Sequence, residues 1–573
     1  MPHGARHRDP DYTDRGIDRG WDRRGPASNG SYYREPAERG SGSRRSAASR
    51  SAARTSPAPR QRNLRASWRR QSPVAKVGYV LATLVAVVAV AASLGGFAIY
   101  RQLTGNITKV NVAGLSGKTI YGSLNILVLG SQTRLHQRGH FGYDANPGVS
   151  NSDNLLIVHL DPTHTHAVVL SIPRDTFVYE PACKERRYVG NGTWPAQAYP
   201  PGAIIDGALN IGGPDCAVAT VEALTGIKLD HFVEFNFNSF RTMVGQLGGV
   251  EVCVPPGRGY HDAATNTNLK PGKHWLNYGA ALQYVRDRHG VGTGADAGGD
   301  LPRIQLQQAF ISSVIQQINK NGLLSDLPKL LHIAGTATKA LTIDSGLGST
   351  TSLLRLAQSL AHLKSRNVTL ITMPATMDTY SYPTYSSHLM TVEPQDDVLF
   401  QMIKRGQPWT GHLPVQSFGS VQVKVVNATG QSGLANRTRT ALRRLGFDVV
   451  SVGDAAYTAT TTVQYAGLAQ ADSAYTVMTA LMAAPAGQNT LVEPAPQEGS
   501  PGPVTLILGA DFKGVNPVVN GAATTKPGKH HRSTKSTGGS GQPTPSNSAG
   551  TVQSRNAGAS ICSGLPPAYS PGG

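Results

Sequence analysis

Charged side chains stand at the ends of two strand-length apolar runs, where they could do chemistry together. Asp153 immediately precedes the apolar run at 155–160. Arg174 and Asp175 directly follow a second apolar run at 167–172. Loops at the carboxyl ends of strands commonly form the ligand crevice of an open α/β sheet. We therefore expect a ligand site at these strand ends.

Two further pairs of side chains have spacings that would place them on shared faces. Arg286 and Arg288 lie two residues apart, so an extended backbone would point both guanidinium groups to one side. Arg303 and Gln307 are four residues apart in a segment with helical spacing, so they would share one helix face. Taken singly, each arginine is also typical of a surface ion pair.

Four arginines and acids that converge on one crevice would suit a phosphate-rich substrate. The forked donors of arginine match phosphate oxygens. An aspartate among them could hold Mg²⁺, which bridges phosphate oxygens and offsets charge during transfer. The residues therefore predict phosphoryl chemistry, provided that they meet in space.

The cysteines and histidines favour structure over catalysis. The chain has four cysteines, Cys183, Cys216, Cys253 and Cys562. They lack the CxxC or CxxxC spacing of a metal cluster, and in an oxidising exterior the three in the main domain allow one disulfide with one thiol left over. His164 and His166 could bind a metal, but we interpret them as the solvated tip between two strands. No GxSxG, HExxH or Walker sequence is present.

The basic character of the chain is concentrated at its start. The 573 residues hold 54 Lys+Arg against 35 Asp+Glu, a net charge of +19, and residues 1–76 contribute +11 of it, from 17 Arg and 1 Lys against 7 acids. Such a tail could bind anionic lipid headgroups or nucleic acid. Because an apolar segment follows it, we interpret it as a solvated tail that sets membrane topology, and we expect no nucleic-acid partner.

A single membrane anchor is predicted at 77–100. The segment has 24 residues without a formal charge, enough to cross a hydrocarbon core of ~30 Å. A cleaved signal peptide would lie nearer the start, and a buried core helix of this length would normally carry a charge. Arg69, Arg70 and Lys76 precede the span, so the positive-inside rule places the N-terminus in the cytoplasm and the bulk of this single-pass cell-membrane protein outside.

Composition and periodicity divide the chain into five parts. Residues 1–72 and 516–573 hold too little apolar surface to offset the entropy of ordering, so we predict a disordered cytoplasmic tail and a disordered extracytoplasmic tail. Between them lie the anchor at 77–100, a main domain at 112–410 and a smaller domain at 418–515.

Both ordered domains have the periodicity of α/β proteins, which predicts layers of helices on a sheet. In the main domain we expect strands at 125–129, 155–160, 167–172, 231–237, 250–254 and 367–373, and helices at 217–224, 239–247 and 303–318. In the smaller domain we expect a strand at 421–426, a helix at 434–445, a strand at 448–452 and a closing segment at 504–512.

With these motifs in order, the stretch from about 120 to 320 resembles the LytR-CpsA-Psr family of cell-wall glycopolymer ligases. The matching motifs are NILVLGS at 125–131, SDNLLIVHLDP at 152–162, SIPRD at 171–175, the segment 207–255, PGKHWLNYGAALQYVRDRH at 271–289 and GGDLPRIQLQQAF at 298–310. Residues 420–512, which include VVNATGQSGLA, resemble the LytR C-terminal domain often attached to this family.

The resemblance implies a layered α/β domain with a central mixed sheet flanked by helices, and an Mg²⁺-dependent phosphotransferase. Such proteins transfer a polyprenyl-pyrophosphate-linked glycopolymer to a peptidoglycan acceptor at the membrane, leaving polyprenyl phosphate; pyrophosphatase activity can accompany transfer. Matching by motif assigns the pyrophosphate to Arg174, Arg286, Arg288 and Arg303, with Gln307 nearby. Asp153 matches an acid implicated in Mg²⁺ binding and in activating the sugar hydroxyl, so Asp153 and Arg174 are the expected catalytic residues.

Three positions depart from the family pattern. Gln132 stands where an Asp commonly follows LGS, and an amide is a weaker Mg²⁺ ligand than a carboxylate. Asn151 and Leu306 replace arginines. Asp144, in the same loop, is a possible substitute for the missing acid. Two rivals follow: a non-catalytic protein that binds the wall or the lipid pyrophosphate, and a membrane-bound transcriptional attenuator.

Overall fold

The computed structural model describes nine stretches of the chain. These are residues 108–132, 151–184, 193–194, 204–292, 299–320, 341–377, 388–482, 502–516 and 552–568. They all belong to the second of two compact units, Met1–Thr83 and Leu84–Gly573. The predicted tail at 1–72 and anchor at 77–100 lie outside the described residues, and among those residues no helix combines the length and apolar character of a membrane span.

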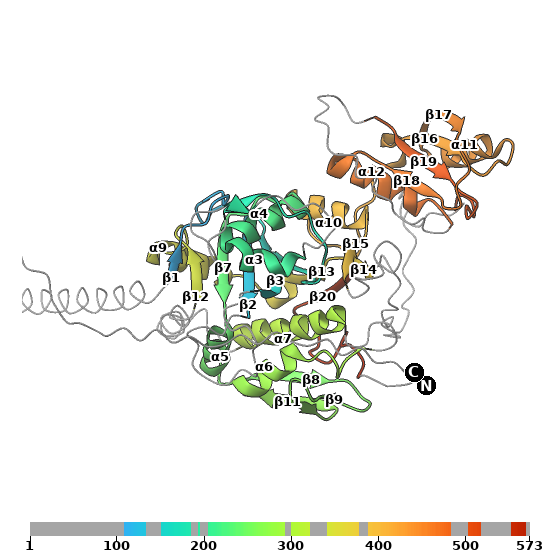
Figure 1. Cartoon of the computed structure of the whole chain (residues 1–573). Coiled ribbons are helices and arrows are strands. Elements are labelled where there is room, and N and C mark those ends of the chain that lie inside the picture. The colour runs from blue at the N-terminus through green and yellow to red at the C-terminus, as the bar shows by residue number, and fades with distance from the viewer. Residues whose placement is uncertain are drawn as a thin grey trace, which may run out of the picture. The chain divides into compact units, whose positions relative to one another are not determined.

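An eight-stranded sheet forms the centre of the main domain (Figure 1). In spatial order the strands are β1 (Thr108–Val110), β12 (Leu341–Asp344), β7 (His231–Phe235), β2 (Leu124–Ser131), β3 (Ser152–Leu160), β4 (Ala167–Ile172), β13 (Val368–Thr372) and β20 (Gln553–Asn556). The β1–β12, β7–β2 and β4–β13 pairs are parallel, and the other neighbours are antiparallel. The expectation of a mixed sheet is therefore confirmed.

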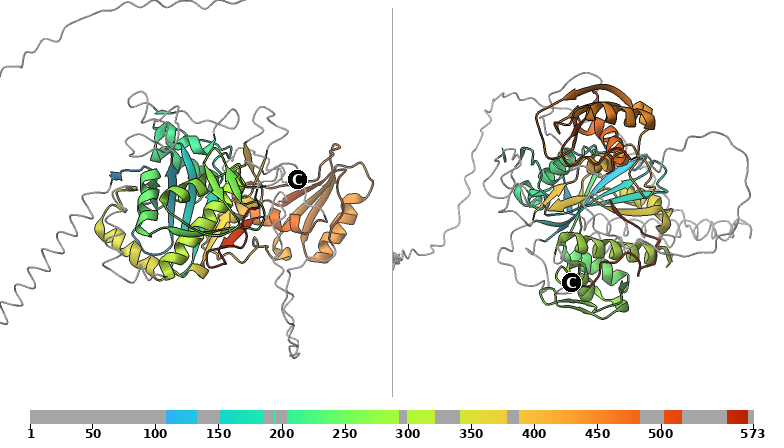
Figure 2. Two further views of the ribbon diagram at one scale, coloured as in Figure 1. Left: turned by 90° about the horizontal axis from the view of Figure 1, so that it is seen from below. Right: turned by 90° about the vertical axis from the view of Figure 1, so that its right-hand side faces the viewer.

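Helices bury both faces of this sheet, which explains the nearly continuous apolar runs of its strands. Successive residues point to opposite faces, so Leu155 and Ile157 join one core cluster while Leu156 joins another. The first face packs against α4 (Pro214–Thr225) and α10 (Gln395–Lys404), and the second against α7 (Asp300–Lys320) and α9 (Thr350–Ala361). Figures 1 and 2 show α4 and α7 on opposite sides of the strands.

A third core cluster lies on the other side of α7. It is formed with α5 (Phe237–Gln246), α6 (Tyr278–Arg286), β8 (Val250–Val254) and β11 (Gly272–Leu276). Asn236 begins α5 with a capping box, its side chain accepting from the Ser239 N–H. The cap explains why the expected strand at 231–237 ends at Phe235. Because α7 packs between this cluster and the sheet, it can present residues to the seam between them.

Shorter elements complete the main domain. They are β5 (Cys183–Lys184), β6 (Thr193–Trp194), η1 (Ile205–Gly207), α3 (Ala208–Gly212), β9 (Tyr260–Asp262), β10 (Thr267–Leu269), η3 (Ser365–Asn367), β14 (Ala375–Met377) and β15 (Leu389–Thr391). A disulfide joins Cys183 of β5 to Cys216 of α4, with 5.3 Å between their Cα atoms.

The smaller domain is an α/β unit with its own four-stranded sheet. After η5 (Phe418–Ser420), its strands lie in the spatial order β17 (Asp448–Asp454), β16 (Gln422–Asn427), β19 (Val504–Leu508) and β18 (Thr462–Gln464), with helices α11 (Leu434–Leu445) and α12 (Gly467–Thr479). The elements expected at 421–426, 434–445, 448–452 and 504–512 correspond to β16, α11, β17 and β19, whereas β18 and α12 were not expected from the sequence.

Residues 552–568 correct the expectation of a disordered tail over 516–573. This segment contains β20, which pairs antiparallel with β13 at the edge of the main sheet. Cys562 forms a disulfide with Cys253 of β8, so the expectation of a leftover thiol in the main domain is also wrong. Composition suggested disorder because the segment buries little apolar surface of its own, whereas a covalent bond and a strand pairing order it.

Leu306 lies inside the third cluster and is fully buried. Leu306→Arg, which introduces the arginine expected here from the resemblance, would bury a charge, so we expect a loss of several kcal/mol in the free energy of unfolding. The matched variant Leu306→Met keeps the volume and should cost less than about 1.5 kcal/mol. Urea unfolding of both variants tests this, and equal midpoints would contradict the placement of Leu306.

Candidate active site

The strand register brings the first two predicted site residues together. β3 and β4 are antiparallel with Leu155 opposite Ile172. Extending this pairing by two residues places Asp153 opposite Arg174, with both side chains on the same face. An Arg174 Nη1–Asp153 Oδ1 ion pair joins them. The sequence prediction that these residues meet at the strand ends is therefore correct for this pair.

Arg174 is the centre of the cluster because three carboxylates surround it. Besides Asp153, its Nε lies 3.4 Å from Asp175 Oδ1 and 3.7 Å from Asp300 Oδ1, and its backbone N–H donates to Asp300 Oδ2 at 3.2 Å. Burial lowers the pKa of Arg174, but the charges of Asp153, Asp175 and Asp300 outweigh burial and raise it. Its guanidinium is thus held as a cation.

The first turn of α7 supplies a second arginine and its acid. Arg303 pairs with Asp300 three residues earlier, and its Nη2 also donates to the backbone carbonyl of Asp153 at 3.4 Å. Both side chains are almost fully buried. Burial raises the pKa of Asp300 and lowers that of Arg303, although each residue opposes the shift in the other. The acid at this position had not been singled out from the sequence.

Arg288 reaches the same cluster from the segment after α6. Its Nη2 lies 3.7 Å from Asp175 Oδ2. Its backbone N–H donates to Asp262 Oδ2 at 3.1 Å, as does that of His289 at 3.2 Å. Burial raises the pKa of Asp262, but these backbone donors outweigh it and lower the pKa to about 2. Asp262 is therefore a fixed anionic anchor for the arginine segment.

Arg286 and Gln307 are placed differently from the expectation. Arg286 is the last residue of α6, not part of an extended segment, and its guanidinium lies over the Phe237 ring, 5.2 Å from the centroid. The shared face predicted for Arg286 and Arg288 is therefore wrong, because the helix ends between them. Gln307 is buried on α7 and donates to the Val285 carbonyl at 3.0 Å, which ties α7 to α6.

Asp206 is a further acid of the cluster that the sequence did not reveal. Its backbone N–H donates to the Arg174 carbonyl at 3.3 Å, and Asn151 Nδ2 donates to its Oδ2 at 3.3 Å. Asp206 Oδ1 is buried without a hydrogen-bond partner. Burial raises the pKa of Asp206 to about 7, against the opposing charge of Arg174. The site thus includes a carboxyl group, that of Asp206, whose pKa lies near neutral pH.

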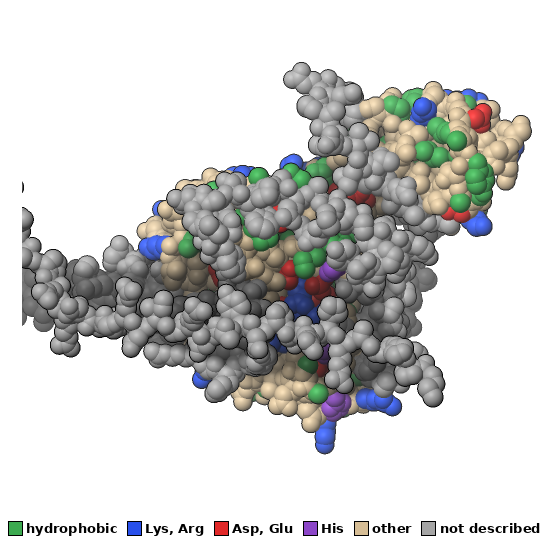
Figure 3. All heavy atoms as spheres, in the orientation of Figure 1, with side chains coloured by type: hydrophobic (Ala, Val, Ile, Leu, Met, Phe, Trp, Pro, Cys, Tyr) green, Lys and Arg blue, Asp and Glu red, His purple; other side chains and the backbone are tan. Residues whose placement is uncertain are grey.

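The completed cluster contains nearly balanced charges. Its members are Arg174, Arg288 and Arg303 with Asp153, Asp175, Asp206 and Asp300. They come from β3, the β4 end, η1, the α6 end and α7. Figure 3 shows acidic and basic side chains gathered beside one another near the middle of the molecule. Such an array can bind a multiply charged anion if the anion replaces the carboxylates that contact the guanidinium groups.

The expected Mg²⁺ site stays a prediction. Within the described stretches, no group of three or more His, Cys, Asp or Glu side chains is arranged to hold a metal ion. Asp144 lies outside those stretches, and the backbone N–H of Gln132 donates to the Asn151 carbonyl at 3.0 Å. The oxygens of Asp153 and the unpartnered Oδ1 of Asp206 remain hard donors of the kind that Mg²⁺ prefers.

The two turn histidines lie away from this cluster. His164 Nε2 makes a 2.7 Å hydrogen bond with the Gly122 carbonyl, and His166 Nδ1 lies 3.6 Å from Asp161. A shallow hollow lined by Asp161, His166 and His159 lies at the far end of β3 from Asp153. His166 contacts Asp161 of the turn, His159 bonds to Asn125 of β2, and none of the clustered arginines lines the hollow.

Comparison with known proteins identifies two family matches. Residues 96–396 match the model described as the LytR_cpsA_psr family. Residues 420–512 match the model described as LytR cell envelope-related transcriptional attenuator. Together these matches cover most of both ordered domains, while residues 552–568 lie outside them.

Two of the similar proteins have names that refer to the cell wall or to peptidoglycan. "Cell wall biosynthesis protein LcpA" of Corynebacterium glutamicum is 26% identical over 385 residues, covering 62% of this chain and 71% of the relative. "Polyisoprenyl-teichoic acid–peptidoglycan teichoic acid transferase TagT" of Bacillus subtilis is 30% identical over 224 residues, 38% of this chain and 61% of the relative. A solved "LytR-Csp2A-Psr enzyme from Actinomyces oris" is 21% identical with a TM-score of 0.38, covering 53% of this chain and 97% of that chain.

The raised pKa of Asp206 predicts a pH-dependent stability. An unfolded Asp titrates near 3.9, so between about pH 4 and 7 the folded chain binds more protons than the unfolded chain, and stability falls as pH rises. Asp206→Asn removes this slope, and its stability relative to the parent should increase across that window. Urea unfolding at several pH values measures it. Asp448→Asn, at an exposed position, is the control; parallel curves for Asp206→Asn and the parent would contradict the assignment.

Proposed function

Because the chain belongs to the LytR_cpsA_psr family, we propose that it transfers a glycopolymer from a polyprenyl-pyrophosphate carrier to peptidoglycan during cell-wall assembly. The relatives named as transferases of polyisoprenyl-linked teichoic acid to peptidoglycan support this reaction class. The single observation that carries the proposal is the convergence of Arg174, Arg288 and Arg303 with their acids where β3 begins and β4 ends.

Diphosphate binding follows from exchange of ionic partners. Each clustered arginine contacts carboxylate oxygens, and Arg174 contacts three acids. A diphosphate offers more negative charge and forked acceptors, so it can replace carboxylates at the guanidinium groups. Burial raises the pKa of Asp206 to about 7, so this carboxyl carries only part of a negative charge near neutral pH and repels the incoming anion less.

The transfer step is a displacement at phosphorus. The hydroxyl of a peptidoglycan sugar attacks the phosphorus that carries the glycopolymer, an O–P bond forms, and the bond to the bridging oxygen breaks. Polyprenyl phosphate leaves with the electron pair. Asp153 accepts the hydroxyl proton, and the arginines neutralise the charge on the leaving phosphate, which is the main catalytic contribution in phosphoryl transfer. With water as the acceptor, the same step is pyrophosphate cleavage.

Mg²⁺ is the cofactor that we propose for this site. Asp153 and Asp206 would hold it, since Gln132 supplies only an amide and Asp206 has an unpartnered oxygen. When bound, the ion would offset negative charge on the phosphate oxygens. The replacement of an acid at 132 and the presence of Asp206 together suggest that the second carboxylate of the site has a different origin in this chain.

The location follows from the substrate. We propose that residues 77–100 anchor the chain in the cell membrane with its N-terminus in the cytoplasm, which would keep both domains on the side of the wall. The two disulfides are consistent with an oxidising exterior.

The full-length protein in detergent, given a lipid-pyrophosphate oligosaccharide, a peptidoglycan oligomer and Mg²⁺, should form glycan–peptidoglycan phosphodiester and release lipid monophosphate. Mass spectrometry of the products measures both. Binding of the lipid pyrophosphate without either product would favour the non-catalytic rival. If the protein neither binds the lipid pyrophosphate nor turns over any glycan, the proposal is refuted.

Diphosphate binding should require both the positive charge of Arg174 and the paired N–H donors of its guanidinium group. Arg174→Lys should weaken the binding of geranylgeranyl pyrophosphate about tenfold, and Arg174→Ala further, because a charge-assisted hydrogen bond contributes about 1.5–3 kcal/mol. Calorimetric titration measures the dissociation constants. Arg437→Lys, an exchange in the smaller domain, is the matched control. Equal affinities of Arg174→Ala and the parent would contradict the assigned site.

A further inference from the structure

The segment 552–568, here called the C-terminal strap, contacts two of the elements that deliver arginines to the site, helix α7 with Arg303 and the segment that carries Arg288. We propose that the strap positions Arg288 and Arg303 for diphosphate binding, so that the catalytic domain is completed by residues from beyond the smaller domain. This inference rests on the proposed function, because it concerns the same site.

The strap is built into the main sheet. Its strand β20 pairs with β13 over four residues, from Thr369 opposite Asn556 to Thr372 opposite Gln553. The Ala557 N–H donates to the Val368 carbonyl at 2.9 Å, and Ala557 is fully buried. The strap thereby covers the edge strand of the sheet, whose backbone groups would otherwise be unpaired.

One face of α7 is held by the strap along its length. Gln305 donates to Gln553 Oε1 at 2.7 Å, and Gln316 donates to the carbonyls of Ala557 and Ala559 at 2.6 and 2.8 Å. Positions seven and eleven residues apart lie on one side of a helix, and Ser312 falls between Gln305 and Gln316 on that side. The same helix carries Arg303 at the site, so its axial position and rotation depend on these contacts.

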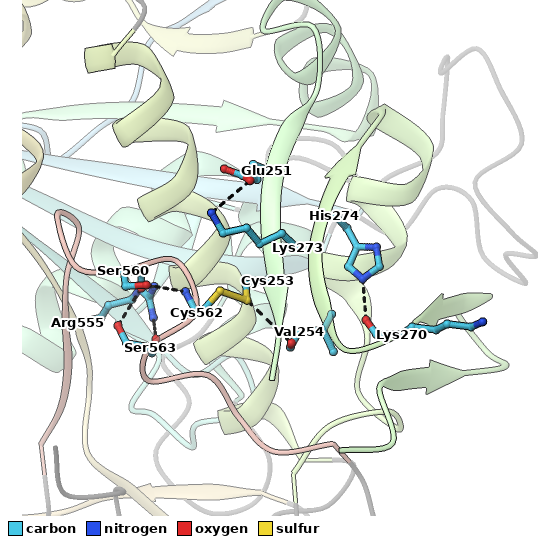
Figure 4. Close-up of a disulfide and its surroundings, with 10 residues drawn as sticks. All are labelled: Glu251, Cys253, Val254, Lys270, Lys273, His274, Arg555, Ser560, Cys562 and Ser563. Atoms are coloured by element: carbon cyan, nitrogen blue, oxygen red, sulfur yellow. Dashed lines mark hydrogen bonds and ion pairs between the residues drawn. A yellow bond between two sulfur atoms is a disulfide. The ribbon is translucent and has the colours of Figure 1, made fainter. Parts of the chain in front are cut away.

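Arg555 is a buried residue of the strap that binds to α7. Its side chain is nearly fully buried, and its Nε donates to Ser312 Oγ at 3.1 Å. Its Nη2 donates to the Ser560 carbonyl at 3.0 Å, and its Nη1 donates to that of Ser563 (Figure 4). A buried guanidinium that bonds to the strap's own carbonyls fixes the curled conformation of residues 555–563, because losing any acceptor would leave a buried donor unsatisfied.

The end of the strap meets the segment that carries Arg288. The Gly292 N–H donates to the Pro567 carbonyl at 2.9 Å, and Val291 forms a bridge with Ala568. The buried Tyr260 hydroxyl donates to the Pro566 carbonyl at 2.6 Å. Residues 288–292 are therefore held between the Asp262 carboxylate on one side and the strap on the other.

The Cys253–Cys562 disulfide fastens the strap to β8 (Figure 4). The bridge spans 309 residues, with 5.1 Å between the Cα atoms. The strap is short and polar, so its non-covalent contacts must offset the entropy of docking, and a covalent link lowers that cost by keeping the segment at high effective concentration. The Cys253–Cys562 disulfide thus holds the strap in the place from which it positions Arg288 and Arg303.

The test compares the full-length protein with the double variant Cys253→Ser/Cys562→Ser. We expect the dissociation constant for geranylgeranyl pyrophosphate to rise about tenfold, and amide hydrogen exchange at 288–292 and in the first turns of α7 to accelerate. Cys183→Ser/Cys216→Ser removes the other disulfide without touching the strap, and exchange at 288–292 should remain at the parental rate. A merely structural strap would leave the affinity of the folded variant unchanged.

A second experiment covers the case in which the double variant does not fold. A protease site inserted between residues 530 and 540 allows the native chain to be cut, after which the disulfide is the covalent tie to the strap. Reductant should then weaken geranylgeranyl pyrophosphate binding, and a synthetic peptide of residues 552–568 should restore it. Unchanged binding after release of the peptide overturns the strap proposal. Failure of the uncut parent to bind instead overturns the proposed function.

Discussion

The structure depends on the cost of burying guanidinium groups. Arg303 is almost fully buried and Arg174 largely so, and an unpaired charge at such positions would cost several kcal/mol. Arg174 therefore pairs with Asp153 of β3 and lies within reach of Asp300 at the start of α7, and Arg303 pairs with Asp300 of its own helix. The β3–β4 register, the cap that begins α5 and the packing of α7 against the sheet are what allow these partners to meet.

This arrangement explains why the sequence revealed some residues and not others. Strands β4 and β8 and helix α11 have the bounds expected from their apolar spacing, because residues buried on a fixed face repeat with a fixed period. Asp153 and Arg174 could be paired in advance because each adjoins such a strand. Asp206 and Asp300 could not, since η1 is three residues long and Asp300 is the first residue of α7, ahead of the helical spacing expected from 303.

The errors have equally local causes. The spacing of two residues between Arg286 and Arg288 places them on one side only of an extended backbone, but α6 continues through Arg286 and Asp287 leaves the helical conformation. Composition gives the apolar surface that a segment can bury by itself, and by that measure residues 552–568 have little reason to order. Composition does not reveal partners that are distant in sequence. Cys562 and Arg555 have such partners, on β8 and α7, hundreds of residues away.

The near balance of acids and arginines also bears on turnover under the proposed function. A site of uncompensated arginines would bind any phosphate tightly, including the lipid monophosphate that remains after transfer. Here every phosphate must displace carboxylates such as Asp175, which contacts both Arg174 and Arg288. A diphosphate can bind several guanidinium groups at once and can therefore displace the carboxylates. A monophosphate binds fewer guanidinium groups, so the carboxylates can displace it in turn. The acids would then discriminate substrate from product by charge, and their return to the arginines would assist product release.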